Sequence, residues 1–428
     1  MLRQYDINRT IPFNYNLANN GNDVIESNIF EQLPISKARK VDIKKRCLNN
    51  IFSNLKFSEK SRSYLPVARK PSYYTQIPKR YRTDFQTYDI MTSVIDGLEN
   101  MGLLESVPGF IDYSKKKGRL TKIKPTDSFK ELSGGLAVNS ITQLEPSELV
   151  ILKKRFDNTL MEYKDDRIIK EIRNQLKKYN ELRQNCKLSL KGLSTNEIQD
   201  NMDFLMLNSA SLVVPDQELK LKNPFMYRVF NGSFKKGGRF YNGIESNMPK
   251  ELREKILIDG EETIELDYNS FHVRILYHQI GKDFKTDAYS CLSGNCPQMR
   301  QVYKLAAMCS INALSKNTAI QAIRKQIVEN GLKSTVSSID DKGINTLLEK
   351  WEAYHSEIKQ LLYSDRGVRL QNLDSKIAAG IIQIFMDAGE VLLCIHDSFI
   401  VKKSLKEMLY QAMMTEYKKH LPFAPVIS

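Results

Sequence analysis

Residues 391–401 read VLLCIHDSFIV, an apolar run of strand-forming residues that reaches His396 and Asp397 and then becomes apolar again. An unpaired charge in a buried strand costs several kcal/mol, so Asp397 needs a cationic partner, a metal ion or a bend that brings it to the surface. An aspartate at a hairpin tip is the simplest alternative. Tips favour Gly, Asn or Pro, however, and the Ser-Phe pair that follows supplies none of them. We therefore expect a strand whose aspartate has a chemical task.

A second stretch has the same design. Residues 261–280 read EETIELDYNSFHVRILYHQI, in which a strand over Thr263–Leu266 ends on Asp267 and helical periodicity begins at Phe271. If the two strands are neighbours, the carboxylates of Asp267 and Asp397 lie a few ångströms apart and repel unless cations separate them. Mg²⁺ is the hard cation that prefers such oxygen ligands. Two such ions about 4 Å apart can promote an in-line phosphoryl displacement.

A basic helix is predicted between these two strands. Residues 297–326 read PQMRQVYKLAAMCSINALSKNTAIQAIRKQ, and Arg300, Lys304, Met308 and Asn312 recur every four residues, so they share one helical face. A cationic pair followed by a neutral surface suits a triphosphate and then a sugar and base. An ordinary basic amphipathic helix is the alternative, but its place between the two aspartates favours the functional interpretation.

In this order, the three stretches resemble the motifs of family A DNA polymerases of the bacterial polymerase I type, and of the related single-subunit bacteriophage-type RNA polymerases. The resemblance covers residues 226–428. It implies that Asp267 and Asp397 hold two Mg²⁺ ions and that Arg300 and Lys304 bind the incoming triphosphate. It also implies that Lys304 can protonate the pyrophosphate leaving group.

The resemblance extends upstream and includes departures from the family pattern. Residues 235–256, KKGGRFYNGIESNMPKELREKI, are similar to the glycine-arginine stretch of the family, which implies that Arg239 and His396 contact the primer end. His272 stands where DNA polymerases of the family carry a glutamate that excludes the ribose 2′-hydroxyl. Asn312 stands where a tyrosine is usual, and with Met308 it would contact the nucleotide. The first motif leans toward the DNA branch, whereas HDSF and Met308 lean toward the RNA branch, so the choice of sugar stays open.

The N-terminal part has the pattern of a winged helix. A helical stripe over residues 90–101 ends at Gly102 and is followed by a short strand, a Pro-Gly break, the basic tip YSKKKGR and the strand LTKIK. Contact with duplex DNA is favoured for this domain, and docking to a protein is the alternative. The residues expected on the wing are Lys115, Lys116, Lys117 and Arg119.

The segment over residues 145–200 is predicted to form one or two long amphipathic helices, with Leu149, Leu152, Phe156 and Leu160 on one apolar side. The expected fold class is α+β, a right-hand polymerase palm with a fingers insertion and a helical thumb. The predicted boundaries are a basic region at 1–60, a winged-helix-like domain at 61–135, a thumb-like clamp at 136–225 and a palm at 226–428 with fingers at about 285–375.

Composition limits the function classes. The net charge of +14 favours a polyanionic partner, because Lys and Arg gain affinity by releasing counterions from phosphates. The six cysteines form no CxxC pair, and no apolar stretch approaches the ~20 residues of a membrane span, so we expect a cytoplasmic protein with reduced thiols.

The predicted function is template-directed nucleotidyl transfer by a small DNA polymerase without a proofreading nuclease. DNA template, primer and nucleoside triphosphates are its expected partners. A single-subunit RNA polymerase or primase is one alternative. A nucleotidyltransferase that needs no template is another, and a DNA-binding replication initiator or regulator with an inactive polymerase domain is a third.

Overall fold

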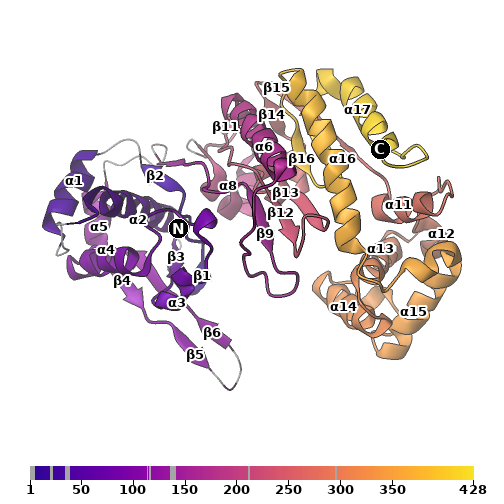
Figure 1. Cartoon of the computed structure of the whole chain (residues 1–428), viewed down its shortest axis with the longest axis horizontal. Coiled ribbons are helices and arrows are strands. Elements are labelled where there is room, and N and C mark those ends of the chain that lie inside the picture. Colours follow the sequence, from indigo (N-terminus) through magenta and orange to yellow (C-terminus); the bar gives the residue numbers. More distant parts are fainter. Residues whose placement is uncertain are drawn as a thin grey trace.

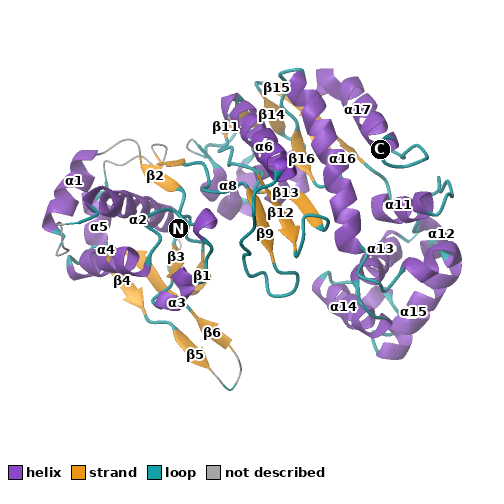
Figure 2. Cartoon of the chain, viewed as in Figure 1, coloured by secondary structure: helices purple, strands orange, loops and turns teal. Residues whose placement is uncertain are grey.

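The chain forms two lobes joined by a narrow connection in the computed structural model (Figure 1). Helices and strands are mixed in both lobes, as the α+β class requires (Figure 2). Within the part of the chain that is described, no helix is both long and apolar enough to cross a bilayer. The structure describes residues 5–19, 23–33, 39–112, 114, 117–134, 141–210, 213–294 and 296–428.

The N-terminal lobe packs two long helices against a small sheet. The sheet has the strand order β1-β3-β7-β4, and its buried side chains form one core with the two helices. Leu55 and Val94 are fully buried at the centre of that core. The elements are α2 (Val41–Ser61), α4 (Tyr88–Asn100), β1 (Asp6–Thr10), β3 (Ser63–Val67), β4 (Leu104–Val107) and β7 (Thr121–Pro125).

A β-hairpin projects from this lobe. Helix α4 ends before Gly102, whose φ of 69° is the left-handed conformation that glycine adopts without strain. Strands β5 (Phe110–Asp112) and β6 (Lys117–Arg119) then pair outside the four-stranded sheet, and Figure 1 shows them extending away from it. The order of helix, strand, hairpin and strand agrees with the predicted pattern. The winged-helix assignment itself stays a prediction.

The C-terminal lobe is organised by a six-stranded sheet with the order β11-β10-β14-β15-β17-β16. Strands β15 and β17 run antiparallel, with Thr263 opposite Lys402 at one end and Asp267 opposite Ser398 at the other. Long helices α6, α16 and α17 pack with this sheet in one apolar core. The strands are β10 (Leu188–Leu190), β11 (Leu219–Lys220), β14 (Ile256–Ile258), β15 (Glu261–Asp267), β16 (Leu393–Ile395) and β17 (Ser398–Lys402); the helices are α6 (Arg167–Asn185), α16 (Gly367–Asp387) and α17 (Lys406–Lys418).

The prediction of a helix over residues 149–160 was wrong. Strand β9 (Val150–Lys153) occupies this stretch and joins β12 (Tyr227–Asn231) and β13 (Gly237–Tyr241) in a three-stranded sheet. Val150 and Leu152 are buried on alternate positions of β9, whereas Phe156 is 78% exposed in the loop that follows. Pairing with β12 and the β-branched Val150-Ile151 pair outweigh a helical periodicity that is shared by chance. Regular helix begins only at α6.

A helical insertion separates the two halves of the six-stranded sheet. It begins after α11 (Phe271–Gln279) and consists of α12 (Ser290–Ser293), α13 (Pro297–Asn312), α14 (Lys316–Glu329) and α15 (Asp341–Tyr354). Helix α13 begins at Pro297, because a proline in its first turn suits a helix start, and the quoted stretch 297–326 continues after a break as α14. The buried Trp351 and His355 connect α15 to the rest of the lobe.

Candidate active site

Asp397 lies at the tip of a hairpin, so the prediction against such a tip was wrong. Ile395 of β16 pairs directly with Ser398 of β17, and His396 and Asp397 form the two-residue turn between them. His396 has a φ of 61°, a left-handed conformation that costs a non-glycine residue about 1 kcal/mol or more. Such strain is concentrated at functional sites, where surrounding structure maintains it. The strained conformation of His396 therefore still favours a functional role for residues 391–401.

The two aspartates lie at the same end of two paired strands. Asp267 is opposite Ser398, and the backbone N–H of Tyr268 donates to the Asp397 carbonyl oxygen at 3.3 Å. Desolvation, followed by the nearby Asp397 carboxylate, raises the pKa of Asp267 to about 7, although its side chain remains accessible to solvent. The like charges thus oppose each other with no cation described between them.

A third carboxylate nearby is already neutralised. Glu265 precedes Asp267 by two residues on β15 and accepts hydrogen bonds from Arg253 Nε at 3.1 Å and Ser398 Oγ at 2.5 Å. Its negative charge is therefore compensated within the fold. Among the described residues, neither Asp267 nor Asp397 forms an ion pair, and the backbone N–H of Tyr268 and the charge of Lys304 are what favours the ionised form of Asp267.

The donor set of this pair fits Mg²⁺. The described residues contain no group of three or more His, Cys, Asp or Glu side chains able to hold a metal, which is the number that a closed structural zinc site needs. Mg²⁺ is commonly bound through one or two carboxylates, with water and substrate phosphates completing its shell. Desolvation is the main cause of the raised pKa of Asp267 and the Asp397 carboxylate is the second, and a bound divalent cation would oppose both by favouring the ionised form.

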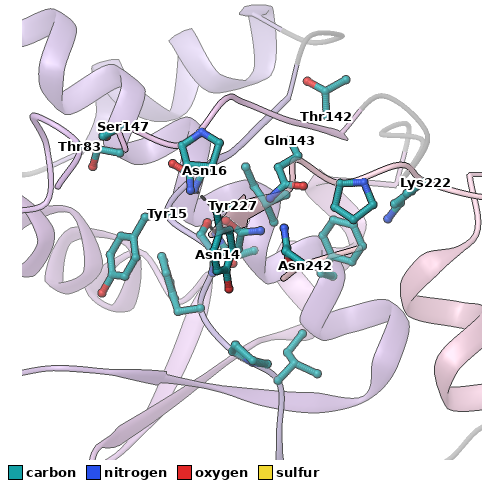
Figure 3. Close-up of a pocket in the computed structure, with 18 of the residues that line it drawn as sticks. Asn14, Tyr15, Asn16, Thr83, Thr142, Gln143, Ser147, Lys222, Tyr227 and Asn242 are labelled. Atoms are coloured by element: carbon teal, nitrogen blue, oxygen red, sulfur yellow. Dashed lines mark hydrogen bonds between the residues drawn. The ribbon is translucent and has the colours of Figure 1, made fainter. Parts of the chain in front are cut away.

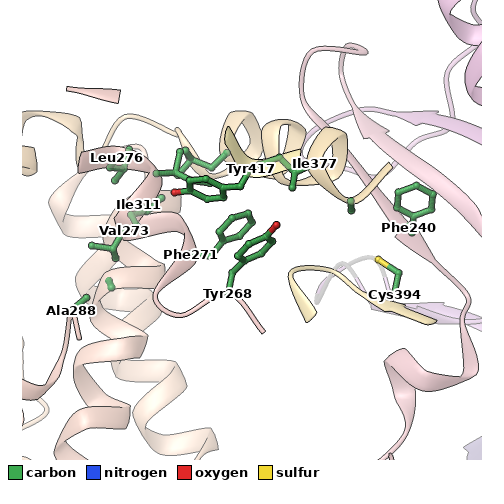
Figure 4. Packing of buried hydrophobic residues seen from close by; sticks show 14 of the residues in the cluster. Phe240, Tyr268, Phe271, Val273, Leu276, Ala288, Ile311, Ile377, Cys394 and Tyr417 are labelled. Carbon is green, nitrogen blue, oxygen red and sulfur yellow. The ribbon is translucent and has the colours of Figure 1, made fainter. Parts of the chain in front are cut away.

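Ring packing holds Tyr268, the residue that follows Asp267, against Phe271 and Tyr417 (Figure 4). The ring of Tyr268 stacks on that of Phe271 with centroids 4.5 Å apart, and its hydroxyl donates to the Met413 carbonyl oxygen at 2.7 Å. Tyr417 packs against both rings. The residue after the aspartate is therefore immobilised, so the carboxylate is presented from a rigid element.

Helix α13 brings one of its two predicted cations to the aspartates. Lys304 is near enough that its charge lowers the pKa of Asp267 against the larger effects that raise it. Arg300 is instead held by Asp287, with Nε 3.1 Å from Oδ2, and its guanidinium lies 5.3 Å from the ring centroid of Tyr289. A triphosphate would have to compete with Asp287 for Arg300.

The neutral end of α13 faces a different space. Asn312 Nδ2 donates to the Met308 carbonyl oxygen at 2.8 Å, and both residues line a cavity of about 540 Å³ together with Arg155 and Phe156. Among the described residues, no hydrogen bond joins Met308 or Asn312 to the two aspartates. Their predicted contact with the nucleotide stays a prediction.

Arg239 and His272 meet at a buried carboxylate that was not predicted from the sequence. Asp374 of α16 accepts from Arg239 Nε at 2.8 Å, and its Oδ2 also lies 3.1 Å from His272 Nε2. Arg239 Nη2 is 3.2 Å from the same imidazole nitrogen. Burial favours deprotonation of Arg239, but the Asp374 carboxylate outweighs it and keeps the guanidinium pKa above its ordinary value.

A periodic signal for Asp374 is present in the sequence. Leu370, Asp374, Ile377 and Ile381 lie three or four residues apart, so the carboxylate falls on the buried face of an apolar helix. A charge in that position requires a cationic partner. Pairing with Arg239 could therefore have been inferred.

His396 is close to this cluster but not hydrogen-bonded to it. Desolvation, then the charge of Arg239, lowers the imidazole pKa, and Nδ1 is buried without a hydrogen-bond partner in the described structure. The ring meets that of Tyr241 edge-on at 5.6 Å. His396 therefore has one unsatisfied nitrogen in the turn that it forms with Asp397, and its lowered pKa favours the neutral ring.

The predicted wing is only partly described. Lys115 and Lys116 lie outside the described residues, as does the side chain of Lys117. Arg119 folds back onto the hairpin, with its guanidinium 5.3 Å from the Phe110 ring centroid and Nη2 donating to the Pro108 carbonyl oxygen at 3.3 Å. The hairpin is in place, whereas phosphate binding by its cations stays a prediction.

Comparisons with known proteins gave one kind of match. No model of a protein family and no curated protein matches the chain. Among solved structures, the chain is similar to the POL domain of Pol1 from M. smegmatis, in a complex with DNA primer-template and dNTP, with 13% identity and a TM-score of 0.35. The match covers 54% of this chain and 50% of that one, so the chain spans about half the length of the matched structure.

Proposed function

We propose that the chain catalyses template-directed nucleotidyl transfer as a small DNA polymerase. The observation that carries this proposal is the placement of Asp267 and Asp397 at one end of two paired strands, with Lys304 of α13 near enough to act on Asp267. Paired carboxylates opposite a cation suit a reaction in which positioning and charge stabilisation supply most of the catalysis. No nucleophilic side chain is required.

Asp267 and Asp397 would hold Mg²⁺, which when bound activates the attacking 3′-hydroxyl and stabilises negative charge on the leaving oxygens. Lys304 would neutralise the pyrophosphate as it leaves and can supply a proton to it. Arg300 would bind the triphosphate after exchanging Asp287 for phosphate oxygens, a bidentate interaction that guanidinium forms well.

Arg239 and His396 would contact the primer end, and His272 would stand at the sugar of the incoming nucleotide. Because Asp374 and Arg239 restrain Nε2 of His272, the ring is a fixed obstacle, which favours deoxynucleotides. The proposal includes no proofreading nuclease, because the sequence offers no second set of acidic residues on strand and helix contexts.

A small RNA polymerase or primase is the second candidate. One observation favours it: Nδ1 of His272 has no hydrogen-bond partner among the described residues and can bond a ribose hydroxyl. The geometry of the ring alone therefore does not distinguish a barrier from a ribose contact.

Primer extension tests the proposal. Wild-type protein should extend a primer with dNTPs in the presence of Mg²⁺ and template, and should fail without either. Asp387→Ala, which removes an exposed carboxylate elsewhere on α16, should extend at the wild-type rate, whereas Asp397→Ala should not. Extension without a template would identify a terminal transferase, and no extension by folded wild-type protein would favour an inactive DNA-binding protein.

A further inference from the structure

A large cavity lies between the two lobes (Figure 3), and its described lining does not include His396 or Asp397. Its volume is about 910 Å³, near the upper end of the range of about 300–1,000 Å³ for ligand sites. Its walls come from the N-terminal segment 11–17, from residues 73–86, from the connection 141–148 and from residues 222–247 of the C-terminal lobe. Both lobes must therefore be present for the site to exist.

The walls combine tyrosine rings with carboxamide side chains. Figure 3 labels two of the tyrosines, Tyr15 and Tyr227, and three of the asparagines. The other aromatic residues of the described lining are Phe13, Phe57, Tyr73 and Tyr81. Aromatic rings accept stacked bases of any sequence, and carboxamides offer a donor and an acceptor to base edges. This combination is suited to unpaired bases, because the edges of paired bases face each other.

The charge of the cavity favours an anionic ligand. Glu148 is the one acidic residue among the described lining residues, and Arg80 and Arg173 already neutralise it. Lys222 is the one basic residue in the described lining. Its Nζ lies 3.7 Å from the ring centroid of Phe57 and 3.3 Å from the Leu207 carbonyl oxygen, and it forms no ion pair with a described carboxylate.

Desolvation, then the charge of Lys60, lowers the pKa of Lys222 to about 7. An ammonium that is desolvated and has no carboxylate partner gains more from an incoming phosphate than a solvated lysine does. Lys222 is therefore placed as the phosphate-binding residue of the cavity.

A chain of rings connects the cavity to the catalytic turn. Tyr227, in the cavity wall, stacks on Tyr241 with centroids 6.4 Å apart and planes inclined by 20°. Tyr241 then meets His396, the neighbour of Asp397, at 5.6 Å. A strand in contact with His396 could thus continue along this aromatic surface into the cavity.

We propose that the inter-lobe cavity binds a short unpaired stretch of nucleic acid, with its bases against the tyrosine rings and a phosphate at Lys222. The inference rests on the proposed function in its choice of nucleic acid as ligand. It does not require that the aspartates catalyse anything.

The test is binding of a labelled oligothymidylate to the full-length protein by fluorescence anisotropy, in EDTA and without nucleotides, over several salt concentrations. Tyr227→Leu should weaken binding roughly tenfold, because the base no longer stacks on a ring. Lys222→Met, which keeps the apolar stem, should weaken it several-fold and reduce the salt slope by about 0.7. Lys350→Met, an exposed change on α15 at the far end of the second lobe, should bind as the wild type does.

A third variant protects the test against misfolding. Asn16→Ala removes a cavity carboxamide that forms no hydrogen bond with another described residue, and it keeps the backbone N–H that donates to Asn14 Oδ1. This variant should therefore retain the wild-type melting temperature while weakening binding several-fold. Wild-type affinity and salt slope in all three cavity variants would overturn the proposal. An equal loss on a blunt duplex would also overturn it, as would tight binding of dTTP alone that depends on Tyr227, because these results indicate a duplex contact or a mononucleotide site.

The same measurements separate this inference from the proposed function. Variant-sensitive single-strand binding by a protein that never extends a primer would keep the cavity assignment and refute the polymerase. If the wild-type protein extends primers and all three cavity variants keep the wild-type affinity for single strands, only the assignment of the cavity is refuted.

Discussion

The paired ends of β15 and β17, where we propose catalysis, and the inter-lobe cavity are made from opposite kinds of side chain. At the strand ends, Asp267 and Asp397 lie close together, and desolvation followed by the charge of Asp397 raises the pKa of Asp267 to about 7. In the cavity, neutral rings and amides form much of the described lining, with Lys222 as its one described basic residue. In the first arrangement the two carboxylates repel each other, and a bound cation would relieve this repulsion. The second presents aromatic rings on which bases of any nucleotide sequence can stack. Chemistry and binding are thus assigned to separate regions of one molecule.

The largest expected effect on activity comes from replacing the two aspartates at the strand ends. Asp267→Ala and Asp397→Ala should each reduce primer extension by roughly a thousandfold or more, and the double variant should lose little beyond either one, because the two act as a unit. Steady-state extension rates at saturating primer-template measure this.

Single-strand binding in EDTA should be unchanged in both aspartate variants, which is what separates the two regions. Near wild-type extension by Asp397→Ala would show that the catalytic turn is assigned wrongly. A large loss of single-strand affinity in the same variant would show that the two regions are one continuous site.

The next effect distinguishes the cavity from the β5–β6 hairpin. Replacing Lys115, Lys116, Lys117 and Arg119 by neutral residues should weaken duplex binding and lower its salt slope by roughly 0.9 for each phosphate that is no longer neutralised. Oligothymidylate binding should survive, because it is assigned to the cavity. Duplex titrations over a range of salt concentrations measure the slope, and an unchanged slope would indicate that the hairpin docks a protein or is purely structural.

Much of the candidate site around Asp267 and Asp397 could be predicted, because the sequence patterns that define its elements are local. Strand-forming residues lead directly to Asp267, and a four-residue recurrence places Lys304 on one face of α13, so each element could be derived from its own segment. Their meeting needed one assumption, namely that the two strands are neighbours. The register of β15 with β17 satisfies it.

Other features could not be predicted because no local pattern defines them. The apolar spacing over residues 149–160 is compatible with a helix, and only pairing with β12 makes β9 a strand. The cavity draws its walls from Ile11 to Asn247, so its tyrosines become one surface only after the lobes meet. The residue preferences of tight turns gave the wrong prediction at His396, because tertiary structure maintains a left-handed conformation that a non-glycine residue disfavours.

A smaller effect is expected at the sugar. His272→Ala should raise ribonucleotide incorporation about tenfold, which corresponds to ~1.4 kcal/mol of differential transition-state binding, because the restrained ring no longer occupies the space of a 2′-hydroxyl. Competition between dNTPs and NTPs in single-nucleotide extension measures the ratio. A wild-type protein that prefers NTPs, and loses this preference in His272→Ala, would reverse the assignment in favour of an RNA polymerase or primase.

Asp374→Asn provides the matched test of that restraint. The substitution keeps the shape of the side chain but removes the charge that holds Arg239 and His272, so ribonucleotide incorporation should rise in the same direction as in His272→Ala. The melting temperature should fall as well, because breaking a buried ion pair leaves Arg239 without its counter-charge. A lower melting temperature with unchanged sugar discrimination would assign Asp374 to stability alone.

The smallest effect is a pH dependence that belongs to the cavity. Because the pKa of Lys222 is lowered to about 7, most of this side chain is protonated near pH 6 and most is neutral near pH 8. A phosphate favours the ammonium form, so binding near pH 8 requires proton uptake and should be weaker by a factor of several, up to about tenfold. Lys60 of α2 is the other ionisable group whose charge acts on Lys222, and it opposes protonation at both pH values. Oligothymidylate titrations at the two pH values in EDTA measure the ratio without any contribution from bound Mg²⁺. In Lys222→Met the ratio should fall to that of the remaining surface charges, and a variant with the full wild-type pH dependence would place the phosphate-binding group elsewhere.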